Sequence, residues 1–77
     1  MDRREYIADE TRNGVEYRAI LTVMGGIGYE AVVDRNTGAI PHMAEFPASN
    51  LGLADRAEYT RVMLASVLNQ MEREARK

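Results

Sequence analysis

The chain has 77 residues, a formal net charge of −2 at pH 7, no cysteine and a single histidine. The length predicts one domain over residues 1–77. The absence of cysteine excludes disulfides and leaves too few ligands for a metal site built from Cys and His. The apolar share of 45% at this low net charge is typical of a folded chain. Short chains without disulfides or metals often gain stability by association, so we expect a homodimer. No sequence motif indicates a cofactor, and none is expected.

Charge and hydropathy restrict the partners and the location. Residues 1–47 hold five basic and eight acidic side chains, a net charge of −3, and residues 48–77 hold five basic and four acidic ones, a net charge of +1. Neither part has the basic excess that phosphate binding normally needs. The charged residues 1–10 do not resemble a signal peptide, and the uncharged stretch 19–29 is too short to cross a membrane. We therefore expect a cytoplasmic protein without a membrane partner.

In chain order, the first predicted element is a charged strand over residues 5–11. Charge on a strand discourages pairing with other sheets, so this strand is expected at an edge. Asn13-Gly14 follows, and Asn-Gly is the favoured pair for a two-residue type I′ turn because both residues tolerate positive φ.

The clearest pattern in the chain is a hairpin formed by residues 15–24 and 27–34, which alternate with period two on either side of Gly25-Gly26. Alternation places one set of side chains on each face of a strand. The set predicted to face the core is Val15, Tyr17, Ala19, Leu21 and Val23, followed by Ile27, Tyr29, Ala31 and Val33. The polar side chains predicted for the outer face are Glu16, Arg18, Glu30 and Asp34. We expect them to form cross-strand ion pairs in preference to a metal or acid–base site.

A fourth strand is predicted over residues 39–46, after a turn that runs from Asp34 to Gly38. Pro41 has no N–H to donate to a ladder, so this strand lies at an edge or is interrupted there. The connections between the strands are all short. They imply an antiparallel meander, because parallel strands would need long crossovers.

A long helix is predicted from Asp55 to about Glu74, with Asp55 as N-cap and Glu58 completing a capping box. Its apolar residues span about half of the circumference, which is more than the stripe of about 100° that one sheet buries. The excess, at Leu64, Leu68 and Val62, is predicted to form a self-association surface. The most buried residues are expected to be Leu21, Val23, Val33 and Val67. The fold class is thus α+β, a four-stranded antiparallel meander followed by one long C-terminal helix packed on one face.

Two features of the sequence are candidate chemical sites. A phosphate loop needs glycines between a strand and a helix, whereas a strand follows Gly25-Gly26-Ile27-Gly28, so we interpret this stretch as a turn. His42 suits acid–base catalysis by residue type. The sequence gives it neither a nucleophile nor an orienting acid, so we expect a surface residue and no catalytic site.

Three functions follow from these observations. The first is a non-enzymatic interaction module that self-associates or binds a protein partner. The second is a single-stranded nucleic-acid binder that uses the open sheet face, with contacts at Arg12, Arg18, Arg35 and Tyr6. The third is a small enzyme, which a buried pair of His42 with a carboxylate in a cleft would favour.

The element order also has two likenesses. Four strands followed by a helix is similar to the order in a family of dimeric single-strand DNA-binding coactivators. Three strands followed by a helix is similar to the opening of HicB-type antitoxins. Both likenesses concern element order without a shared residue motif, so no family is assigned.

Overall fold

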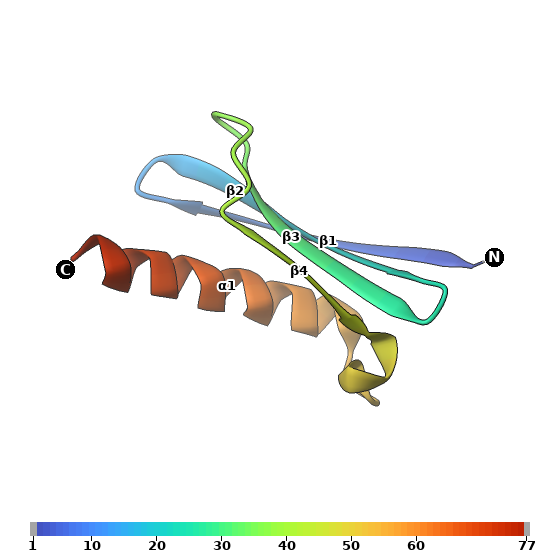
Figure 1. Ribbon diagram of the computed structural model, residues 1–77. Helices are drawn as coiled ribbons and strands as arrows, with labels where there is room; N and C mark the ends of the chain where they lie inside the picture. Colours follow the sequence, from blue (N-terminus) through green and yellow to red (C-terminus); the bar gives the residue numbers. More distant parts are fainter. Residues whose placement is uncertain (1, 77) are drawn as a thin grey trace.

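The computed structural model describes residues 2–76, which form one antiparallel sheet and one long helix (Figure 1). The sheet order is β1-β2-β3-β4, and α1 lies across one face, closer to β1 and β2 than to the other two strands. The elements are β1 (Arg3–Arg12), β2 (Val15–Met24), β3 (Ile27–Asp34), β4 (His42–Pro47), the 3-10 helix η1 (Ala48–Leu51) and α1 (Arg56–Ala75). The predicted α+β meander with a C-terminal helix is confirmed. No helix within residues 2–76 has both the length and the apolar character needed to cross a membrane.

Both predicted two-residue turns are present. Asn13 and Gly14 have φ angles of 52° and 79°, and Gly25 and Gly26 have φ angles of 59° and 78°. Two successive residues with positive φ are the signature of a type I′ turn, whose twist matches that of the flanking strands. The second turn therefore sets Met24 directly opposite Ile27.

The register of this second hairpin corrects the predicted core face of β3. Directly opposite residues of a sheet share a face, and Leu21 lies opposite Glu30 while Val23 lies opposite Gly28. The helix-facing set of β3 is therefore Gly28, Glu30 and Val32. The set predicted to face the core, Ile27, Tyr29, Ala31 and Val33, lies on the outer face. The prediction was wrong because it followed the apolar pattern and neglected the pairing that a two-residue turn imposes.

The core lies between α1 and the first three strands. Leu21 is fully buried as predicted, whereas Val23, Val33 and Val67 are only half-buried. The buried apolar side chains of the core are Ala8, Ala19, Leu21 and Val32 from the sheet, Leu51 from η1, and Met63, Leu64 and Leu68 from α1.

The position of Leu64 and Leu68 corrects the predicted free flank of the helix. Their exposed fractions are 1% and 2%, because both face the sheet. Of the three residues predicted for self-association, only Val62 is on the surface, with 57% exposed. The apolar arc of α1 that the sheet leaves partly open instead contains Val67 and Met71.

The two ends of the helix are held in different ways. Asp55 caps the first turn as predicted, because its Oδ1 accepts from the Ala57 and Glu58 amides at 2.9 and 3.2 Å. Glu58 itself pairs with Arg61. Near this end, the Phe46 ring of β4 lies 6.2 Å from the Tyr59 ring, centroid to centroid. The same ring covers Gly28, where an added Cβ would come within 2.6 Å of Phe46 Cε2, so Gly28 makes room for this contact.

The core assignment predicts that Leu21→Ala lowers the free energy of unfolding by about 2–5 kcal/mol, through lost transfer energy and a residual cavity. Val62→Ala is the control and is expected to change it by less than about 0.5 kcal/mol, because Val62 lies on the surface. Urea unfolding followed by circular dichroism measures both values. Equal losses for the two variants would contradict the assignment.

Candidate functional site

An apolar row crosses all four strands on the face that the helix leaves open. Ile7 lies opposite Ile20, Ile20 opposite Ala31, and Ala31 opposite Met43. We call these four residues the outer row. Ile7 is 52% and Met43 74% exposed, and the two central members are half-buried. The outer row is therefore a continuous apolar strip on the surface, which is unlike the isolated apolar side chains common on protein surfaces.

The outer row borders a shallow depression and is flanked by charged residues. A shallow depression of about 470 Å³ includes Ile20, Ala31 and Met43 together with the exposed Tyr29. In the register, Glu5 and Glu45 lie on one side of the row, and Asp9 with Arg18 lies on the other. An apolar centre with a polar margin is the usual anatomy of a protein–protein interface.

The predicted ion pairs of the outer face are only partly present. Glu16 and Arg18 lie on that face, but Arg18 pairs with Asp9 of β1, with Nε–Oδ1 and Nη2–Oδ2 distances of 2.8 and 3.1 Å. The hydrogen bonds from Arg18 lower the pKa of Asp9 below its ordinary value. Asp34 instead accepts from the Asn36 and Thr37 amides and so holds the following turn. Glu30 points to the other side of the sheet.

Glu30 forms the centre of a polar cluster between the sheet and the helix. Its side chain is 8% exposed. Oε1 accepts a hydrogen bond from the Tyr59 hydroxyl at 2.5 Å, and Oε2 lies 2.5 Å from Nε2 of His42. This contact leaves His42 half-buried, whereas the sequence analysis predicted an exposed surface residue without a partner. The sequence analysis did not predict this cluster, because it placed Glu30 on the outer face. The two-residue length of the Gly25-Gly26 turn fixes the strand pairing and would have indicated the correct face.

A groove of about 580 Å³ opens beside this cluster, between the start of β4 and α1. Pro41 and His42 form one wall. The helix forms the other wall. Its apolar strip contains Met63, Val67 and Met71, and its polar strip contains Ser66, Gln70 and Glu74. The groove exists because α1 runs over β1 and β2 and leaves this part of the sheet uncovered.

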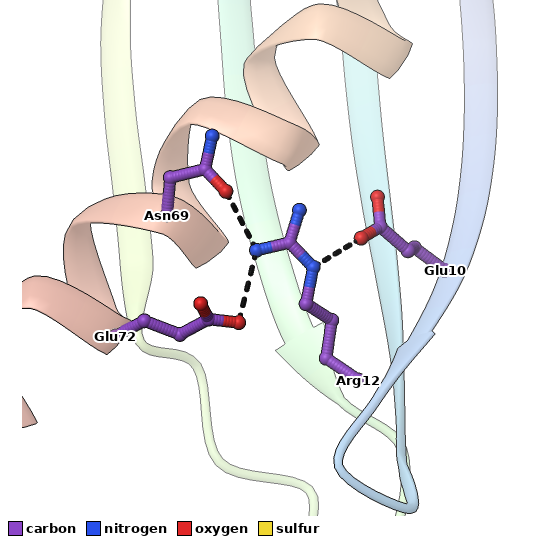
Figure 2. Close-up of polar contacts among 4 residues, drawn as sticks. All are labelled: Glu10, Arg12, Asn69 and Glu72. Carbon is purple, nitrogen blue, oxygen red and sulfur yellow. Dashed lines mark hydrogen bonds and ion pairs between the residues drawn. The ribbon is translucent and has the colours of Figure 1, made fainter.

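The nucleic-acid contacts proposed from the sequence do not come together. Arg12 lies on the helix side, where its Nη1 donates to Asn69 Oδ1 at 2.7 Å and to Glu72 Oε1 at 3.1 Å, and its Nε pairs with Glu10 (Figure 2). Arg18 lies on the outer face beside Asp9, Arg35 is exposed in the turn after β3, and Tyr6 is half-buried on the helix side. The four side chains share no surface.

Comparisons of the chain with protein-family models, curated proteins and solved structures found no match. Among the described residues, 2–76, no group of three or more acidic or histidine side chains is arranged to hold a metal ion.

The pKa of Tyr59 gives a test of the cluster. Burial, with a smaller contribution from Glu30, raises this pKa from 10.0 to about 12. Between these values the folded protein keeps a proton that the unfolded chain loses, so the stabilisation is complete below pH 10 and falls as the pH rises toward 12. Tyr59→Phe should flatten this alkaline loss in denaturant unfolding measured at a series of pH values. The same steep loss in the variant would contradict the assignment.

Proposed function

We propose that this protein is a small non-enzymatic interaction module that forms a homodimer through the outer face of its sheet. The outer row supports the proposal, because it is an apolar strip that spans the whole sheet and has no cover within the described chain. Burial of apolar surface stabilises association by about 25 cal/mol per Å² before the opposing entropy terms. A second reason is stability: a small core without disulfides contributes little by itself, and association adds to it.

A two-fold axis along the outer row is compatible with this surface. Such an axis sets each residue of the row against its own copy, as isologous interfaces require. It also turns the side with Glu5 and Glu45 toward the partner's side with Asp9 and Arg18, so that Glu5 of each copy lies over the Asp9–Arg18 ion pair of the other. Two sheets packed face to face lie about 10 Å apart, which the side chains of the row can fill.

The helix is a weaker candidate for the same role. Leu64 and Leu68, two of the three residues first assigned to it, are in the core. Val62 is exposed, but it lines the groove beside β4 and is separated from the buried Leu64 and Leu68. The proposal therefore keeps the expected homodimer and moves its surface to the sheet.

Charge substitution in the outer row tests the dimer. Ile7→Glu and Met43→Glu alter exposed side chains, so the fold should persist while each raises the dimer dissociation constant at least about tenfold by burying an unpaired charge. Sedimentation equilibrium measures the constant, with Val62→Glu as the matched helix variant that should leave it unchanged. A monomeric wild-type protein, or dissociation caused by Val62→Glu alone, would refute the sheet-face dimer.

Because the chain has no cysteine, a single introduced thiol reports on the axis. Ile20→Cys should be cross-linked to its own copy by a short bis-maleimide, since the axis sets residue 20 against itself. Glu58→Cys on the exposed helix surface is the control. Cross-linking of the control only would contradict the arrangement.

Single-stranded nucleic acid stays an alternative that can be tested directly. The charge of −3 over residues 1–47 and the acidic partners of Arg12 and Arg18 argue against it. We expect no change in fluorescence polarisation of mixed-sequence oligonucleotides at low salt. Tight binding that falls steeply with salt and is weakened by Arg18→Ala would instead favour this alternative.

The pair of Glu30 and His42 is the observation that favours a small enzyme as a further alternative. A carboxylate that orients an imidazole is common to many general bases. The Tyr59 hydroxyl, however, donates to Glu30. Within residues 2–76 no hydroxyl group hydrogen-bonds to the imidazole. The cluster lacks an activated nucleophile and fits binding better than catalysis.

A further inference from the structure

The carboxylate of Glu30 is buried without a permanent cation beside it. Its two hydrogen-bond partners are the Tyr59 hydroxyl and the His42 imidazole, and no Lys or Arg of residues 2–76 forms an ion pair with it. Burial of a carboxylate is unfavourable unless it is hydrogen-bonded and, better, paired with a positive charge. The hydrogen bonds are present, and Glu30 lines the groove, from which a cation can approach it.

The groove has the charge and shape to accept such a counter-charge. Its lining includes Glu30 and Glu74 and, among the described residues, no Lys or Arg. Met63, Val67 and Met71 follow one another at intervals of four along α1, so they form one apolar strip, and Ser66, Gln70 and Glu74 form a polar strip beside it. A ligand that is apolar along its length and cationic at one end matches both strips.

His42 stands beside Glu30 in the wall of the groove. Its Nε2 lies 2.5 Å from Oε2 of Glu30. The imidazole is about one-third exposed and lines the groove. An ammonium group in the groove is attracted by the carboxylates of Glu30 and Glu74, whereas an anion would be repelled by them.

We propose that the groove between β4 and α1 binds a small molecule that carries an ammonium group on an apolar body. The ammonium group lies near Glu30 and His42, and the apolar body lies along Met63, Val67 and Met71. The groove volume of about 580 Å³ is within the usual range for small-molecule sites, about 300–1,000 Å³. The site is on the opposite side of the sheet from the outer row, so it does not depend on the proposed dimer.

A set of three probes of similar shape tests the charge preference: 2-phenylethylamine, 2-phenylethanol and phenylacetate. Binding is followed by NMR through the imidazole signal of His42, which is unambiguous because the chain has one histidine. The amine should bind about tenfold tighter than the alcohol, as expected for one hydrogen bond to a charged group, and phenylacetate should bind more weakly than either. Equal affinities, or no shift of the His42 signal with the amine, would overturn the proposal.

Variants separate the site from a non-specific effect. Glu30→Gln keeps the size and an acceptor oxygen, and it should weaken amine binding about tenfold while leaving the alcohol unchanged. Glu45→Gln, an equally conservative change on the outer face, is the control and should change neither. If Glu30→Gln does not fold, Glu74→Gln at the exposed end of the polar strip serves, with a smaller loss of about two- to threefold. Unchanged amine affinity in the folded Glu30 variant, or in Glu74→Gln when that variant is used, would refute the site.

Discussion

The structure depends on the two-residue turn at Gly25-Gly26. Both glycines adopt positive φ, which sets Met24 opposite Ile27 and fixes the pairing of β2 with β3 along its whole length. A strand shifted by one residue would exchange its two faces. This one constraint therefore turns Glu30 toward the helix and Ala31 toward the open face. The polar cluster and the outer row are two consequences of the same turn.

The helix is placed by contacts at its two ends. Near its start, Tyr59 meets the Phe46 ring and the Glu30 carboxylate. Near its end, Asn69 and Glu72 bind Arg12 beside the first turn (Figure 2). Between these contacts α1 lies along one face of the sheet, as Figure 1 shows, and it is closer to β1 and β2 than to the other strands. A helix is about 10 Å wide and a four-stranded sheet nearly twice that, so part of the sheet stays uncovered and becomes a groove.

The two faces of the sheet consequently suit different partners. The outer face is apolar at its centre, with a shallow depression and a charged margin, and it is the surface of the proposed dimer. The helix side is concave and acidic, with a buried carboxylate and an imidazole, which fits a small cationic ligand. Because the sheet separates the two surfaces, the proposed dimer and the proposed ligand site do not compete for the same residues.

Local sequence determined the elements: the Asn13-Gly14 and Gly25-Gly26 pairs mark the turns, period-two alternation marks β2 and β3, and Asp55 marks the helix start. It also placed Leu21 in the core. Only the tertiary structure decided which face of β3 is inside, because Val32 and Val33 are equally apolar and strand pairing alone distinguishes them. It likewise decided that Leu64 and Leu68 face the sheet, since an apolar arc wider than its contact does not specify the angle at which the helix docks. The Glu30–His42–Tyr59 cluster joins three elements, and no local pattern reveals such a contact.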